Sequence, residues 1–139
     1  MQFLRLKTVA FRNLRDGLWE PHPRFNLLTG ENGQGKTNTI EALHLVGALK
    51  SWRATRLVEL VTFGASVASV AADLEVLGLE RHLEVRVQEG GRRAISEGKT
   101  CRDAASFLRG IQVVLFCPED LALPRGAPGD RRRWLDRAI

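Results

Sequence analysis

The feature that most constrains this chain is a glycine-rich run, 29-TGENGQGKT-37, between an apolar segment and a segment of helical periodicity. Its glycines permit backbone angles that other residues resist, so the run can curl tightly. The amides then form a nest for phosphate oxygens, and the following helix adds its partly positive N-terminus. The spacing Gly30-x-x-x-x-Gly35-Lys36-Thr37 therefore predicts a phosphate-binding loop, the P-loop.

Two side chains at the end of this loop carry specific chemistry. Lys36 supplies a positive charge to the β- and γ-phosphates, and Thr37 offers a hydroxyl ligand to Mg²⁺. We therefore predict that the loop binds ATP together with Mg²⁺. The loop residues expected at the nucleotide are Gly30, Glu31, Asn32, Gly33, Gln34, Gly35, Lys36 and Thr37.

Composition places the chain among soluble globular proteins. It has 139 residues, of which 44% are hydrophobic and 27% charged, enough for one domain with a sizeable core. The net charge of +5 permits a polyanionic partner without requiring one. No apolar run approaches the ~20 residues of a membrane span, and charged residues interrupt the N-terminus, unlike a signal peptide. Two cysteines without C-x-x-C spacing fit a reducing compartment, so we expect a cytoplasmic protein without membrane contact.

Periodicity predicts an α/β chain in three parts, covering 1–50, 51–110 and 111–139. Residues alternate with period two over 70–76 and again over 82–88, and Gly90-Gly91 follows as a hairpin turn, which predicts an antiparallel meander. The run 111-IQVVLF-116 is typical of a strand buried on both faces. In chain order we expect strands at 2–11 and 24–29 with a strand-and-turn excursion at 17–23 between them, helices at 37–50 and 56–63, strands at 70–76, 83–88 and 92–98, a helix at 102–109, a strand at 111–116 and a helix from 130.

Two further stretches point to a family. Phe11-Arg12-Asn13 precedes the loop, and 114-VLFCPEDLALPRGAPGDRRRWLD-136 closes the chain. With them the chain resembles the RecF family of bacterial recombination and gap-repair proteins, within the SMC and Rad50 group of ABC-type ATPases. The resemblance implies an ABC/SMC-head P-loop nucleoside triphosphate hydrolase fold. We thus expect an incomplete α/β domain, a mixed sheet with an antiparallel meander packed on the P-loop core.

The resemblance also implies roles for residues outside the loop. Arg12 and Asn13 would approach the nucleotide phosphates. The segment 117–120 stands where related ATPases carry the Q-loop, and Glu119 is the candidate polar sensor of the metal, although a solvated turn is an alternative. The arginines that open the last helix would form either a solvated face or a contact with DNA phosphate or a partner. These arginines are Arg131, Arg132 and Arg133.

For function, the resemblance implies an ATP-dependent homodimer that acts as a clamp on DNA, both single-stranded and duplex, at gaps. It would act with RecR and RecO and help to load RecA in recombinational repair and replication-fork maintenance. The sequence has no S-x-G-Q signature and no apolar strand leading directly into Asp-Glu, the Walker B pattern. We therefore expect the N-terminal part of such an ATPase, able to bind nucleotide but with negligible turnover alone.

Two other interpretations remain open from the residues alone. A small free-standing P-loop kinase would hold its metal with Glu119 or Asp120, at the end of a strand 111–116 that lies beside the P-loop strand. A basic DNA-binding module would carry a vestigial P-loop and depend on its arginines. The position of 111–116 in the sheet distinguishes the first of these from the RecF-like interpretation.

Overall fold

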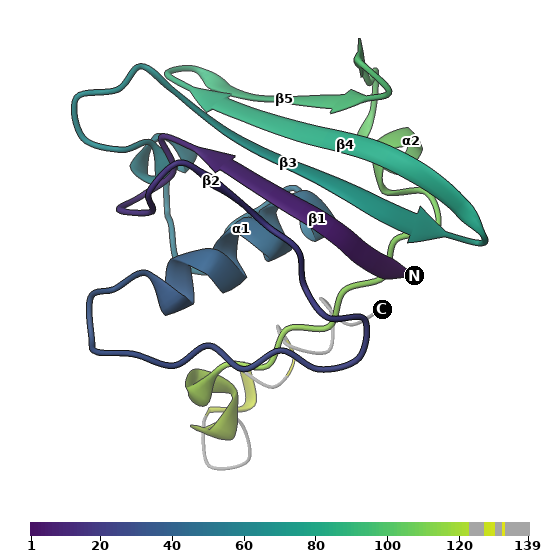
Figure 1. Ribbon diagram of the computed structural model, residues 1–139. Helices are drawn as coiled ribbons and strands as arrows, with labels where there is room; N and C mark the ends of the chain where they lie inside the picture. Colours follow the sequence, from purple (N-terminus) through teal and green to yellow (C-terminus); the bar gives the residue numbers. More distant parts are fainter. Residues whose placement is uncertain (123–126, 130–131, 133–139) are drawn as a thin grey trace.

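The computed structural model describes residues 1–122, 127–129 and 132. Its described residues form one sheet in the order β2-β1-β3-β4-β5-β6, with every pairing antiparallel (Figure 1). The strands are β1 Gln2–Val9, β2 Gly17–Trp19, β3 Val67–Val76, β4 Leu79–Gln88, β5 Gly91–Ser96 and β6 Lys99–Thr100. The helices are α1 Lys36–Ala48 and α2 Ala104–Leu108, with 3₁₀ turns η1 Leu57–Leu60 and η2 Pro118–Ala122.

The predicted meander is confirmed as the hairpins that join β3, β4 and β5. The second turn consists of Glu89 and Gly90 and not of the predicted Gly90-Gly91, because Gly91 already pairs with Gln88 in β5. Buried and accessible side chains alternate along β3 and the second half of β4, as expected of strands with one covered face. Leu77 and Gly78 connect β3 to β4 with φ angles of 54° and 77°. Positive φ at both central residues is the type I′ geometry that matches the twist of paired strands.

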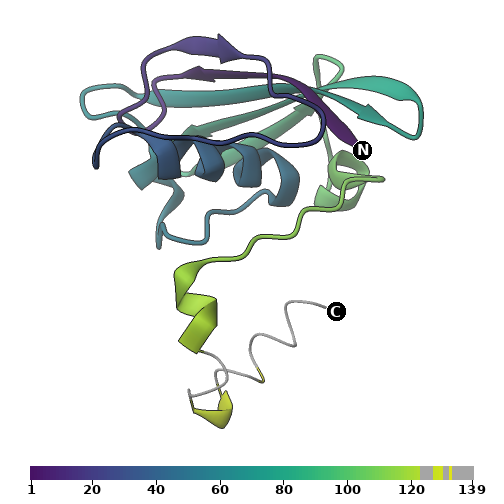
Figure 2. The same ribbon diagram turned by 60° about the horizontal axis from the view of Figure 1, so that its bottom comes forward.

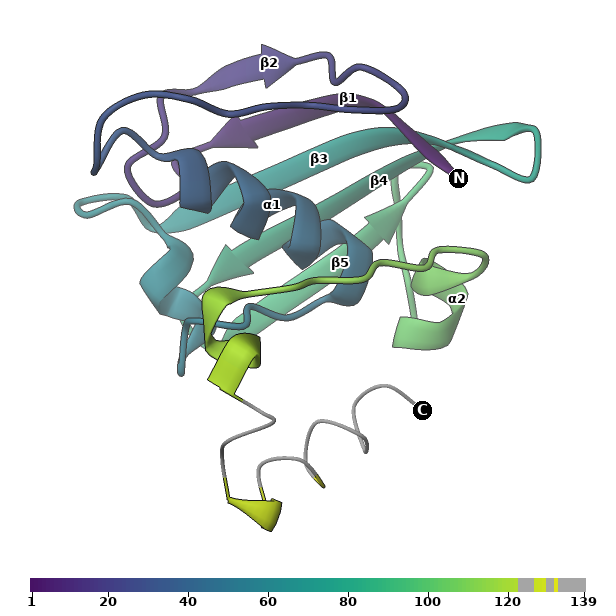
Figure 3. The same ribbon diagram turned by 90° about the horizontal axis from the view of Figure 1, so that it is seen from below.

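One face of the sheet is covered by α1, which lies across β3 and β4 on the side that Figures 2 and 3 show. The core lies between these two layers. Its fully buried side chains include Leu45 and Val46 of α1 and Leu74, Leu83 and Val85 of the sheet. No helix in the described part of the chain has the length and apolar character that crossing a membrane requires.

Two predicted strands are wrong. Residues 24–29 and 111–116 belong to no strand, and their apolar side chains stay accessible, with Phe25 75% and Val114 96% exposed. A strand buried on both faces needs ladder partners for its backbone groups, and the described residues supply none for either segment. The segment 111–116 instead runs across the α1 side of the sheet (Figure 3).

Helix α1 accepts this segment because Gly47 has no side chain. A Cβ atom at Gly47 would collide with the side chain of Val113. All strand pairings of the described residues are antiparallel. The parallel part of the expected mixed sheet is thus not found among the described residues. The predicted helix 56–63 is only the short turn η1, and the helix predicted from 130 falls outside the described residues.

Candidate nucleotide-binding site

The loop 29–37 leads into α1 through glycines with left-handed backbones. Gly30, Gly33 and Gly35 have φ angles of 137°, 82° and 97°, and α1 begins directly after, at Lys36. Such angles strain other L-residues, so the glycines are required by conformation. Gly35 is also tightly packed, because a Cβ there would lie 2.6 Å from Cδ2 of Leu14.

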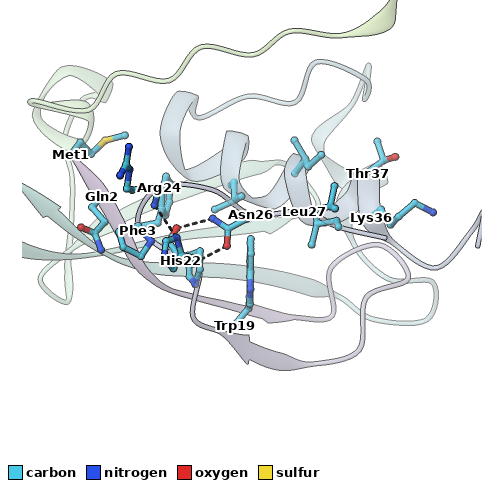
Figure 4. Close-up of a pocket in the computed structure, with 15 residues that line it drawn as sticks. Met1, Gln2, Phe3, Trp19, His22, Arg24, Asn26, Leu27, Lys36 and Thr37 are labelled. Carbon is cyan, nitrogen blue, oxygen red and sulfur yellow. Dashed lines mark hydrogen bonds between the residues drawn. The ribbon is translucent and has the colours of Figure 1, made fainter. Parts of the chain in front are cut away.

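The Lys36 side chain folds back over the loop. Its Nζ donates to the carbonyl oxygens of Gly30 at 2.6 Å and Glu31 at 2.7 Å. The ammonium group is thus held at the loop backbone, where it can meet an anion. Lys36 and Thr37 lie at one end of a cavity of about 620 Å³ between α1 and residues 19–28, and Met1 and Gln2 line its other end (Figure 4).

The Asn13 side chain is hydrogen-bonded to the loop backbone. Its Nδ2 donates to the Gly33 carbonyl at 2.6 Å, and its Oδ1 accepts from Nδ2 of Asn38 at 2.7 Å. Arg53 donates in turn to Oδ1 of Asn38 at 3.1 Å. A trans peptide places a carbonyl and the next N–H on opposite sides, so holding the Gly33 carbonyl on Asn13 turns the Gln34 N–H the other way.

The Arg12 side chain, by contrast, binds residues outside the loop. Its Nε and one terminal nitrogen donate to the two carboxylate oxygens of Glu41, each at 3.0 Å, and the other terminal nitrogen donates to the Glu59 carbonyl at 2.9 Å. The predicted contacts of Arg12 and Asn13 with phosphate stay predictions. What the structure places at the loop is the Asn13 side chain.

Glu41 is fully buried and binds more than Arg12. Ser51 donates its hydroxyl to the same carboxylate at 2.5 Å, and an Arg53 nitrogen lies 3.8 Å away. Burial by itself raises the pKa of Glu41, but the hydrogen bonds from Arg12 and Ser51, together with the arginine charges, outweigh it and lower the pKa. The buried, charged carboxylate of Glu41 therefore lies at the centre of a network of partly exposed polar side chains beside α1.

Sequence reasoning missed this network, which consists of Asn38, Glu41, Ser51 and Arg53. One signal was present: Glu41 lies four residues before Leu45, on the buried face of α1. An acid at an inward-facing helix position predicts a buried partner, because an unpaired carboxylate there costs too much. The sequence does not indicate which arginine supplies the pair.

The remaining predicted site residues lie elsewhere. Glu119 is part of η2, and its metal role stays a prediction. Asp120 accepts from the Cys117 N–H at 2.7 Å, within its own turn. Arg132 is exposed, whereas Arg131 and Arg133 lie outside the described residues, so DNA contact by these arginines also stays a prediction.

Comparisons with known proteins fit this geometry. The chain is 46% identical to "DNA replication and repair protein RecF" of Anaeromyxobacter dehalogenans (strain 2CP-C) and 40% identical to the protein of that name from Myxococcus xanthus (strain DK1622). These alignments cover 99% and 100% of the chain but only 38% and 37% of the relatives. No family model matches the chain.

Solved structures agree on the fold. A structure described as the recombination mediator protein RecF-ATP in the RecFOR pathway matches with a TM-score of 0.86 and 28% identity, over 97% of this chain and 37% of that one. A structure from work on ATP-driven dimerisation and DNA-stimulated activation of SMC ATPases matches with a TM-score of 0.81 at 18% identity, over the whole of both chains, and indicates the fold alone. The predicted fold class, part of an ABC/SMC-type P-loop head, is thereby confirmed.

The kinase alternative is not supported. It required 111–116 to be a strand beside the strand that leads into the loop, and neither segment is a strand here. Asp120, one of its two proposed metal ligands, has its carboxylate bound to a backbone N–H of its own turn.

Proposed function

We propose that this chain, which over its whole length matches the N-terminal part of the RecF family, binds ATP through the loop 29–37. The observation that carries the proposal is the loop itself: three left-handed glycines curl it ahead of α1, and Lys36 is held across its carbonyls. A curled backbone of this kind presents successive amides to phosphate oxygens, and the helix N-terminus adds positive potential.

Each residue of the site has a role in this proposal. Lys36 places an ammonium charge where β- and γ-phosphate oxygens would lie. The Thr37 hydroxyl is a hard oxygen donor beside Lys36 on the same cavity, which suits it to hold Mg²⁺. Mg²⁺, when bound with the nucleotide, neutralises phosphate charge. Asn13 holds the Gly33 carbonyl outward, which keeps the nest shaped for an anion.

The wider function proposed is that of the relatives. The chain spans about 38% of the length of the curated relatives it matches, so DNA binding, ATP-dependent dimerisation and a role in recombinational repair of single-strand gaps are proposals for the protein to which this part corresponds. They draw support from relatives named for DNA replication and repair. Action with RecR and RecO, loading of RecA, and a cytoplasmic location are proposed with them.

Titration calorimetry of the chain with ATP and Mg²⁺ tests the central claim. Lys36→Ala is expected to weaken binding by at least about tenfold, because a charge-assisted contact is worth about 1.5–3 kcal/mol. Lys7→Ala is the matched control, since Lys7 is an exposed lysine of β1 whose neighbours Leu6 and Thr8 face the core. Equal affinities of the native chain and Lys36→Ala would refute the role of Lys36, and no binding by the native chain would refute the proposal.

A further inference from the structure

Glu41 is the one carboxylate with no exposed surface among the side chains whose burial the structure describes. It lies on α1, four residues after Thr37, and takes no part in the contacts assigned to phosphate or Mg²⁺ above. Burying a carboxylate is costly unless it is paired and hydrogen-bonded. Its two oxygens receive both donors of a bidentate Arg12 fork, so the charge is fully compensated.

The Arg12 fork closes an unusual backbone turn. Arg12 has a φ angle of 53°, a left-handed conformation that non-glycine residues rarely adopt. Three further hydrogen bonds hold Arg12 in this conformation. Its N–H donates to the Leu60 carbonyl at 2.8 Å, and its carbonyl accepts from the Thr62 hydroxyl at 2.6 Å. Its guanidinium donates to the Glu59 carbonyl. Strained residues persist where the surroundings over-determine them, often at functional sites.

The two residues after this turn, Asn13 and Leu14, both contact the loop. Asn13 donates to the Gly33 carbonyl, and Leu14 occupies the space that a side chain at Gly35 would need. The path from the buried carboxylate to the phosphate nest is therefore short and continuous: Glu41 holds Arg12, Arg12 fixes the turn, and the turn presents Asn13. Nothing in this path requires Arg12 to reach a phosphate.

We propose that Glu41 is a positioning residue for ATP binding, acting through Arg12 to hold the Asn13 side chain on the Gly33 carbonyl. The inference rests on the proposed function of the loop. It adds a residue that touches no nucleotide but sets the shape of the nest. The loop conformation is thus supported from α1, which follows the loop, as well as from the turn that precedes it.

A double-mutant cycle on the 139-residue chain tests this path. The variants are Glu41→Gln, Asn13→Ala and the two combined, and the measurements are ATP·Mg affinity by calorimetry and the thermal unfolding midpoint by circular dichroism. Each single variant is expected to weaken ATP binding by about tenfold, since each disturbs a hydrogen bond that shapes the nest. The double variant is expected to bind ATP no more weakly than the single variant with the lower affinity, because both substitutions disturb the same contact between Asn13 and the Gly33 carbonyl.

Glu84→Gln is the matched control. Glu84 is also a hydrogen-bonded acid, bound by Arg86 and Ser69, but it lies on β4 far in sequence from the loop and its removal should leave ATP affinity unchanged. If Glu41→Gln unfolds the chain, Arg12→Lys combined with Asn13→Ala replaces it, since lysine keeps the charge and loses the fork. That pair should again be non-additive.

The outcomes separate this inference from the proposed function. Affinity losses that multiply in the double variant, or an unchanged or tighter affinity in Glu41→Gln, would overturn the inference even if Lys36→Ala still weakens ATP binding as expected. Absence of ATP binding by the native chain would overturn both. A lower unfolding midpoint with native affinity would leave Glu41 with a structural role only and would also overturn the inference.

Discussion

Gly35 is held by two separate constraints, one from its backbone and one from its neighbour. Its φ angle of 97° belongs to the left-handed region, and Leu14 leaves no room for a Cβ atom. Gly33 shares the first constraint, with φ at 82°, but nothing lies within 4 Å of a Cβ built there. The two positions look alike in the sequence, and only the packing of Leu14 distinguishes them.

This difference predicts unequal effects of alanine. Gly33→Ala should destabilise the chain by about 1–2 kcal/mol through backbone strain alone. Gly35→Ala should cost about 1–3 kcal/mol more, because the methyl group must also displace the Leu14 side chain. Urea unfolding of both variants, followed by circular dichroism, measures the two free energies. Equal losses would mean that the Leu14 contact yields without cost.

At the scale of elements, the hairpins are the most strongly specified parts of the chain. The alternation of their side chains is a local signal, and the structure confirms the strands that it predicted. The apolar runs at 24–29 and 111–116 are local signals of the same strength, yet neither forms a strand. A hairpin brings its own ladder partner within a few residues, whereas an isolated apolar run depends on partners from elsewhere.

The β3–β4 turn supplies a prediction at this scale. Leu77 occupies a left-handed position with its side chain 91% exposed, where leucine is strained and asparagine is favoured. Leu77→Asn should stabilise the chain by about 0.5–1 kcal/mol, measured as a higher urea midpoint. Leu79→Asn is the control, because Leu79 is similarly exposed but lies in β4, where asparagine is disfavoured. Stabilisation by both substitutions would mean that reduced surface apolarity, and not the turn, is responsible.

At the scale of the whole molecule, the described residues form a two-layer unit that leaves several large apolar side chains exposed. Phe25 and Leu27 before the loop, and Val114 and Phe116 after α2, are all at least 69% exposed. At the loop, Lys36 donates to the carbonyls of Gly30 and Glu31, and no carboxylate of the described residues is hydrogen-bonded to it. Asp120 is bound within its own turn.

We therefore expect binding without catalysis. Phosphoryl transfer needs groups that orient the attacking water and neutralise developing charge, and the sequence has neither the signature nor the Walker B pattern. Phosphate release from ATP by the purified chain should not exceed that of Lys36→Ala, measured under the same conditions with a continuous phosphate assay. Release that depends on Lys36 would contradict this expectation and show that the chain contains its own catalytic groups.

The sequence by itself determined the parts whose causes are local. Glycines at fixed spacing before Lys36 specify the loop, and periodicity specifies α1 and the meander, because backbone preference and side-chain alternation act within a few residues. Only the tertiary structure decided that Arg12 pairs with Glu41, 29 residues away, and that Asn13 closes on the Gly33 carbonyl, 20 residues away. It also showed that 24–29 and 111–116 have no ladder partners among the residues that the structure describes. Contacts of this range depend on the path of the chain between them, which no local pattern records.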